Sequence, residues 1–451
     1  MTSCRKLKLR RVAFTSAALL LALTCVSAAA DQNSASHDAL EALQKQLAQP
    51  GVKPAAIESQ AFAKVALTKE DAAAAKKLLW DYHAAEITKD RAEEIKNGLV
   101  KYEKMEMPFT IQEFGKEPEA GWSLWFSLHG GGGAPKQVND QQYENQKRLY
   151  KLQEGLYLVP RAPTNTWNLW HESHIDHLFD RLIEDLIVLK HVDPNRVYVM
   201  GYSAGGDGVY QLGPRMADRW AAAAMMAGHP NDASPLSLRN VAFAIQVGAL
   251  DAAYDRNKIA QKWIDRLDEL EKADPKGYVH FSKIHAGKSH WMDLEDAKVL
   301  PWMAAKTRNP VPDRVVWMQN TTVHDRSYWL AVPKADPSLA GKAVTVDRDH
   351  NLFTIKSCDP IGPLLIHVDD RMIDFDQPVK VVFDQKTLFD QKLPRTIATL
   401  EKTLAQRGDP DLVFSGEVNV TAVEAKPAEE KKADEKKPDE KKVEKQAEAK
   451  K

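Results

Sequence analysis

RVYVMGYSAGGDG, residues 196–208, is the stretch of this sequence that decides its fold. Its apolar run Val197–Met200 is typical of a buried strand, and the next five residues, Gly201–Gly205, match the pattern G-x-S-x-G. In that pattern a strand ends in a tight turn with the serine at its apex, and a helix follows. Such a turn is crowded, so the positions two residues before and two residues after the serine need glycine. The pattern also arises by chance in loops, but the strand-like and helix-compatible flanks favour the structured turn.

Apolar runs on both sides of this stretch predict further strands of one sheet. We expect these strands at residues 122–128, 155–159, 197–200, 221–227, 241–247 and 279–284. Helical patterns lie between them, over residues 178–187 and 259–270. Buried strands that alternate with helices are typical of a mostly parallel sheet covered on both faces. We therefore predict a doubly wound α/β domain over residues 109–308, with its site at the carboxyl ends of the strands.

Three other segments flank this domain. Residues 31–108 are rich in Ala, Glu, Lys and Leu, and predict a helical segment with helix starts at Thr68 and Thr88 that packs on the next domain or covers its cleft. Residues 308–312 predict a linker, and short strand-like pieces over 309–421, with a helix at 397–406, predict a small antiparallel β-rich domain. Residues 422–451 are almost all charged, Ala or Pro, which predicts a disordered tail.

The first 30 residues predict export. Five basic residues precede an apolar run over 12–26, and Ala28-Ala29-Ala30 follows it, as in a signal peptide cleaved after Ala30. An uncleaved membrane anchor is the alternative, but the run is short for one. Cleavage removes Cys4 and Cys25, so the mature chain keeps only Cys358 and forms no internal disulfide. We expect a secreted or periplasmic protein without a stable membrane span.

The overall composition limits the classes of partner. The 451 residues carry a formal net charge of −1, and 43% of them are hydrophobic. This balance is typical of a globular protein and provides no global attraction to nucleic acid or to anionic membranes. We therefore expect no nucleic-acid partner.

The residues that follow the predicted strands suggest a catalytic set. A serine nucleophile needs a base to accept its proton and an acid to orient that base. Ser203 is the candidate nucleophile, and His290 follows the last strand on a glycine-containing loop, whereas His285 lies nearer the strand and is the rival base. For the acid, Asp251 follows the strand at 241–247, and Asp255 is its rival. The chain order serine, aspartate, histidine is the order that an α/β sheet with this serine turn requires.

A glycine run after the strand at 122–128 supplies candidate donors for an oxyanion. The run His129-Gly130-Gly131-Gly132-Gly133 allows backbone N–H groups to approach a substrate oxygen closely. We expect Gly131, Gly132 and Ala204 to donate. A flexible loop and a phosphate cradle are the alternatives, but neither G-x-G-x-x-G nor a Lys-Ser/Thr ending is present.

The sequence has four motifs in this order along the chain: His129–Gly133, Gly201–Gly205, Gly248–Asp251 and Gly287–His290. Together they resemble the α/β-hydrolase superfamily. Within it the chain is most similar to exported esterases of the polyhydroxybutyrate-depolymerase, feruloyl-esterase and acetylxylan-esterase type, over residues 109–305. The resemblance implies a serine carboxylesterase that needs no metal or organic cofactor and acts on a small-molecule or polymeric ester. Contact with the cell envelope or with a polysaccharide is a further expectation for the flanking segments.

Aromatic and histidine side chains near the motifs are candidates for the substrate-facing wall. We expect this wall to include His129, Trp167, Trp170, His171, Tyr202, His229 and Trp291. His171, His174 and His177 recur at three-residue spacing, but they do not form H-E-x-x-H, so surface packing is favoured over a zinc site.

Two other functions remain open from the residues alone. A peptidase of the prolyl-oligopeptidase kind shares these motifs, although no repeat of propeller-blade length is present in the sequence. The second is a non-catalytic protein that binds polysaccharide or envelope on a hydrolase scaffold, which the complete set of motifs disfavours.

Overall fold

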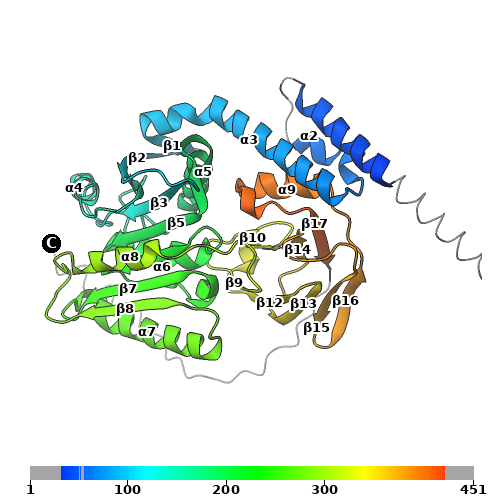
Figure 1. Cartoon of the computed structure of the whole chain (residues 1–451). Helices are drawn as coiled ribbons and strands as arrows, with labels where there is room; N and C mark the ends of the chain where they lie inside the picture. Colours follow the sequence, from blue (N-terminus) through cyan, green and yellow to red (C-terminus); the bar gives the residue numbers. More distant parts are fainter. Residues whose placement is uncertain (1–31, 50, 52–54, 422–451) are drawn as a thin grey trace, which may run out of the picture.

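The computed structural model describes residues 32–49, 51 and 55–421 (Figure 1). The expected signal peptide, with Cys4 and Cys25, and the expected charged tail lie outside the described residues. Within the described ranges, no helix combines the length and apolar character needed to cross a bilayer.

One large sheet forms the centre of the molecule. Its eight strands lie in the order β1-β2-β4-β3-β5-β6-β7-β8. The six strands β4, β3, β5, β6, β7 and β8 run parallel to one another, whereas β2 is antiparallel to both of its neighbours, β1 and β4. Their bounds are Leu99–Tyr102, Met105–Phe114, Trp122–Leu128, Gly155–Pro160, Val192–Tyr202, Ala222–Met226, Ala242–Gly248 and His280–His285, for β1 to β8 in chain order. The predicted α/β fold is confirmed.

Helices cover both faces of this sheet, which is why its strands are apolar along their whole length. All seven residues of β3 are buried, and Leu124 and Phe126 face one layer while Trp125 faces the other. The first layer contains α5 (Ser173–Lys190), α6 (Ala204–Arg215) and α7 (Arg256–Ala273). The second layer contains α8 (Leu300–Ala304), and α4 (Lys136–Gln146) packs on the same face of the sheet.

The sheet begins at Leu99, ten residues before the predicted start of the α/β domain. The expected boundary at residue 109 falls inside β2, and β1 also precedes it. β1 is the edge strand and β2 is its neighbour, and β2 has buried, half-buried and exposed residues in no regular alternation. An edge strand without a continuous apolar run or a clear period of two has no strong sequence signal.

The N-terminal segment is helical and packs away from the pocket beside Ser203. A helix is described over residues 32–47, followed by α2 (Ala55–Glu58) and the 29-residue α3 (Lys69–Asn97). The Thr68 side chain accepts a hydrogen bond from the Asp71 N–H and caps α3, as predicted. The second predicted start is wrong, because Thr88 lies inside α3 and its hydroxyl bonds the Ala84 carbonyl. These helices share a hydrophobic cluster with α9 (Ile397–Arg407).

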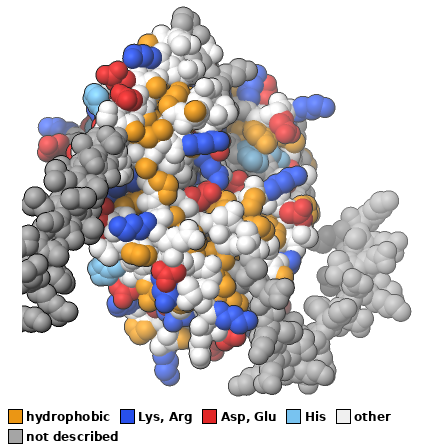
Figure 2. Space-filling view, turned by 90° about the vertical axis from the view of Figure 1, so that its right-hand side faces the viewer, with side chains coloured by type: hydrophobic (Ala, Val, Ile, Leu, Met, Phe, Trp, Pro, Cys, Tyr) orange, Lys and Arg blue, Asp and Glu red, His pale blue; other side chains and the backbone are white. Residues whose placement is uncertain are grey.

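Two further sheets form the region after residue 308. One has the order β10-β11-β14-β17 and the other β16-β15-β13-β12-β9. Their strands, β9 to β17, span Arg314–Met318, Arg326–Ser327, Leu330–Ala331, Ala343–Asp349, Leu352–Cys358, Leu364–Val368, Val379–Phe383, Lys386–Gln391 and Gly416–Val420. The β-rich prediction is confirmed, with one correction: β13 and β15 pair in parallel. On the face that Figure 2 shows, acidic and basic side chains are interspersed and neither sign dominates.

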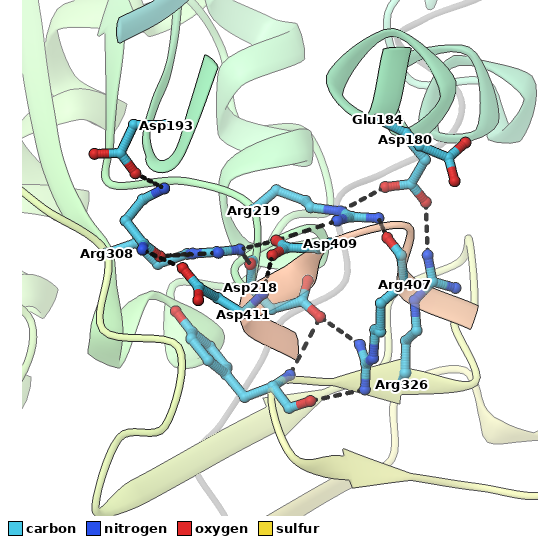
Figure 3. Close-up of polar contacts among 12 residues, drawn as sticks. Asp180, Glu184, Asp193, Asp218, Arg219, Arg308, Arg326, Arg407, Asp409 and Asp411 are labelled. Carbon is cyan, nitrogen blue, oxygen red and sulfur yellow. Dashed lines mark hydrogen bonds and ion pairs between the residues drawn. The ribbon is translucent and has the colours of Figure 1, made fainter. Parts of the chain in front are cut away.

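A buried network of arginines and aspartates joins this β-rich region to the large sheet (Figure 3). Arg219 and Arg326 both donate to Asp180 on α5, at 2.8 and 2.7 Å. Arg407, at the end of α9, donates to Asp218 at 2.6 Å. Ion pairs in such positions fix the relative placement of the elements because each charge needs its partner once water is excluded.

Arg308 is the residue of this network that corrects the linker prediction. It is only 3% exposed, and its guanidinium donates to the Asp409 carboxylate at 2.8 Å and to the Asp218 carbonyl at 2.6 Å. Two further bonds, of 3.0 and 2.9 Å, reach the Asn195 side-chain oxygen. The start of the segment 308–312 is therefore anchored in the interior instead of linking two independent units.

Replacing Arg308 by Met is expected to lower the free energy of unfolding by about 3–5 kcal/mol, because the buried Asp409 carboxylate loses its main partner. Chemical denaturation measures this loss. The matched control is Arg266→Met, which breaks the exposed pair with Glu269 and should cost less than about 1 kcal/mol. Equal losses in the two variants would contradict the role given to the network.

Candidate active site

The candidate nucleophile occupies a strained turn between β5 and α6. Ser203 has φ 57° and ψ −121°, a backbone conformation that residues other than glycine rarely adopt. A side chain on Gly201 would collide with the carbonyl of Gly205, and one on Gly205 would collide with the carbonyl of Leu128. Both flanking glycines are thus required for the turn, as the sequence pattern predicts. The strain holds the serine above the carboxyl edge of the sheet.

A chain of two hydrogen bonds links three side chains that follow the ends of β5, β7 and β8. His290 Nε2 lies 3.0 Å from Ser203 Oγ, and His290 Nδ1 lies 2.8 Å from Asp251 Oδ2. Asp251 is 2% exposed and follows β7, while His290 lies on the loop after β8. The imidazole is therefore placed to accept the serine proton while the buried carboxylate orients its other nitrogen.

The rival residues have other partners. Asp255 is exposed and pairs with Lys258 at 2.8 Å, so it does not reach the imidazole of His290. His285 is buried, with Nε2 at 2.7 Å from the Gln246 side-chain oxygen and Nδ1 at 3.3 Å from Glu295. It holds the base of the loop that carries His290.

The topology and the site together identify the fold. The serine lies on a sharp strand-to-helix turn of a mostly parallel sheet, and the acid and the histidine follow later strands in that order. This is an α/β-hydrolase fold.

Comparisons with known proteins give partial likenesses to solved structures of esterases. No protein-family model and no curated protein matches the sequence. A thermostable esterase has a TM-score of 0.37 and 14% identity, covering 48% of this chain and 64% of that chain. A carboxylesterase from Mesorhizobium loti has a TM-score of 0.32 and 15% identity, covering 46% and 99%. A ferulic acid esterase has a TM-score of 0.29 and 14% identity, covering 46% and 95%.

The glycine loop packs directly against the serine. A side-chain carbon on Gly130 would stand 3.3 Å from the Ser203 Cβ, and one on Gly132 would stand 3.4 Å from the Ala204 Cβ. Gly131 and Gly132 have φ of 107° and 77°, so the loop depends on glycine. The loop thus brings backbone N–H groups beside the position of the nucleophile.

One of the three expected oxyanion donors is already occupied. The Gly132 N–H donates to the Asn139 side-chain oxygen at 2.9 Å, which corrects its assignment as a donor. The Gly131 N–H has no acceptor among the described residues. The Ala204 N–H is the first of α6 and has no acceptor within the helix. The structure leaves these two N–H groups available.

Asn139 is a site residue that the sequence did not reveal. It is fully buried on α4, and its side-chain nitrogen donates back to the Ala134 carbonyl at 3.0 Å. Together with its bond to Gly132, this bond holds the glycine loop at two positions. A single asparagine on a polar helix has no pattern that would distinguish it from its neighbours.

His129 and Trp170 are structural and do not face substrate, contrary to expectation. His129 is fully buried, with Nδ1 2.6 Å from the Gly130 carbonyl and Nε2 accepting from the Ala162 N–H at 3.2 Å. Burial lowers the pKa of His129 to about 4, which keeps the ring neutral. Trp170 is also fully buried and donates to the His129 carbonyl at 3.0 Å. Both side chains support the glycine loop from below.

A pocket of about 430 Å³ opens beside Ser203. Tyr202 and Trp291 line it, as predicted, and Trp291 is 46% exposed. The other lining residues are Gly130, Gly131, Gln142, Asn145, Gln146, Leu149, Ser203 and His290. No lysine, arginine, aspartate or glutamate is among these described residues.

The remaining aromatic and histidine candidates lie outside this pocket. Trp167 is 62% exposed and contacts the Gly133 side of the loop. His171 packs against Trp167 and lines a different pocket, between the start of α5 and residues 321–326. Burial lowers the pKa of His171 to about 4. His229 is half-buried and accepts from the Asn231 N–H at 2.9 Å. For these three a role with substrate stays a prediction.

The described residues hold one group with metal-ligand spacing, and it is not at this site. Asp268, Glu271 and His280 have ligand atoms within 4.8 Å of one another. His280 begins β8, so this group lies at the opposite end of the sheet from Ser203. His174 instead lies 3.3 Å from Glu172, and His177 stacks on Tyr102.

Tyr202 joins the nucleophile turn to the loop that carries the base. Its hydroxyl donates to the His290 carbonyl at 2.6 Å and accepts from the Met292 N–H at 3.0 Å. Burial raises the pKa of Tyr202, so the hydroxyl stays protonated and can donate. The residue that precedes the serine therefore fixes the backbone on both sides of Trp291.

Tyr202→Phe removes this hydroxyl and is expected to slow the reaction of Ser203 with a fluorophosphonate by about fivefold to tenfold, since one hydrogen bond contributes about 1 kcal/mol. The second-order rate constant of labelling measures the effect. Tyr150→Phe is the control, because Tyr150 is buried and its hydroxyl bonds Asp296 without touching the triad. An unchanged rate in Tyr202→Phe, or equal slowing in both variants, would contradict the positioning role.

Proposed function

We propose that this chain is an exported serine hydrolase that cleaves carboxylic esters through an acyl-enzyme. The observation that carries the proposal is the chain of two hydrogen bonds, of 3.0 and 2.8 Å, from Ser203 through His290 to Asp251. A serine hydroxyl is a weak nucleophile until a base accepts its proton, and this geometry supplies the base and its orienting acid. The signal-like pattern of residues 1–30 supports export.

Each residue then has one role in the reaction. Ser203 Oγ attacks the ester carbonyl while His290 Nε2 accepts its proton, and Asp251 holds the proton on Nδ1. The Gly131 and Ala204 N–H groups donate to the oxyanion of the tetrahedral intermediate. His290 returns the proton to the departing alcohol, which leaves the acyl group on Ser203. Water activated by His290 then releases the acid and restores the serine.

The pocket supports a neutral substrate. It adjoins the serine, the imidazole and the free N–H of Gly131, which are the groups that an ester carbonyl must reach. Because no charged side chain lines it within the described chain, a charged substituent would be desolvated there without a partner. A small-molecule ester or one unit of a polymeric ester fits these requirements.

Hydrolysis of p-nitrophenyl acetate by matched variants tests this proposal. Ser203→Ala is expected to lower kcat to the background, and Asp251→Asn to lower it by about 10³- to 10⁴-fold, because the histidine loses its correct tautomer. Asp255→Asn is the control and should stay within about twofold of the wild type, since its carboxylate is exposed and paired with Lys258.

Two results would contradict the proposal. Full activity in Ser203→Ala would remove the assigned nucleophile. Cleavage of peptide substrates with no cleavage of esters would instead support a peptidase.

A further inference from the structure

Among the described residues, the carboxamide side chains that line the pocket beside Ser203 include one without a hydrogen-bond partner. The Tyr202 hydroxyl already makes two bonds, and the Gln146 amide donates to the Ser127 hydroxyl at 2.7 Å. Asn145 accepts from the Gln141 amide at 3.0 Å. Gln142 neither donates to nor accepts from any described residue, although it is half-buried and lines the pocket. Its carboxamide is thus free to bind what enters.

Gln142 also lies close to the reacting atoms. Its side-chain oxygen is 3.7 Å from the position of a side-chain carbon on Gly130, and that position is 3.3 Å from the Ser203 Cβ. Gln142 reaches this position from α4, the helix whose Asn139 holds the glycine loop. The backbone of Gln142 is therefore held relative to the glycine loop by the same helix that carries Asn139.

We propose that this pocket takes an uncharged, hydroxyl-bearing group of the ester and that Gln142 is the residue that selects it. The inference rests on the proposed ester hydrolysis at Ser203 and adds the class of substrate. A carboxamide offers both a donor and an acceptor, which matches a hydroxyl. An alkyl group in the same place removes water from Gln142 and returns no hydrogen bond. The absence of charged lining residues, within the part of the chain that is described, excludes selection of an ionic group.

Two pairs of nearly isosteric esters test the selection. p-Nitrophenyl glycolate and p-nitrophenyl propionate differ by hydroxyl for methyl in the acyl group, and 2-hydroxyethyl acetate and propyl acetate differ in the same way in the alcohol. For each pair the ratio of kcat/KM, hydroxylated over alkyl, is measured in the wild type and in Gln142→Leu. Because the same two esters are used with both proteins, dividing the ratio of the variant by the ratio of the wild type cancels the intrinsic reactivity of each ester.

Gln142→Leu is expected to lower this ratio by about threefold to tenfold in at least one pair, which corresponds to one neutral hydrogen bond. Gln142→Glu keeps an acceptor of the same shape and should retain more of the ratio. Gln137→Leu is the control, because Gln137 is exposed on the same helix and does not line the pocket. Its ratios should match the wild type.

The possible failures are distinguishable. Ratios within twofold of the wild type for both pairs in Gln142→Leu would overturn the selection by Gln142 while ester hydrolysis stands. Equal loss of the ratio in Gln137→Leu would also overturn it. A wild-type protein inactive on all four esters would contradict the proposed function, and the selection with it.

Discussion

The turn at Ser203 is the constraint on which the rest of the site depends. A backbone at φ 57° and ψ −121° costs about 1–3 kcal/mol and persists only where its surroundings impose it. Here the backbone of Gly205 and Leu128 closes around the two flanking glycines, and the Ser203 N–H donates to the Met226 carbonyl at 2.9 Å. The turn therefore fixes the serine relative to β3, β6 and α6 at once. The glycine loop after β3 and the loop after β8 then pack against a serine whose backbone the turn already fixes.

Each partner of the serine is held by residues beyond the triad. Tyr202 fixes the loop of His290, and Asn139 fixes the loop that offers the Gly131 N–H. His129 and Trp170 support that loop from the interior. Farther away, the arginine and aspartate network attaches the β-rich region to the large sheet through Arg308 and Arg407. The result is a site whose reacting groups sit on strand ends that packing holds rigid.

The sequence predicts this protein best where one physical requirement dominates. Buried strands such as β3 are apolar throughout, and parallel strands end at one edge, so the sequence alone places Ser203, Asp251 and His290 together. Prediction fails where side-chain contacts decide. Gly132 resembles a free donor because nothing in the sequence links it to Asn139, and His129 and Trp170 resemble cleft residues because motif proximity does not reveal burial. The edge strand β1 and its neighbour β2 escape prediction because they lack an apolar run.

The central claim is that Ser203 is a nucleophile activated by His290. The most direct measurement is to treat the protein with a fluorophosphonate, digest it and locate the adduct by mass spectrometry. The account predicts one adduct, on the peptide that carries Ser203, and its disappearance when His290 is replaced by Ala. An unlabelled Ser203, or labelling that persists without the imidazole, would contradict the account.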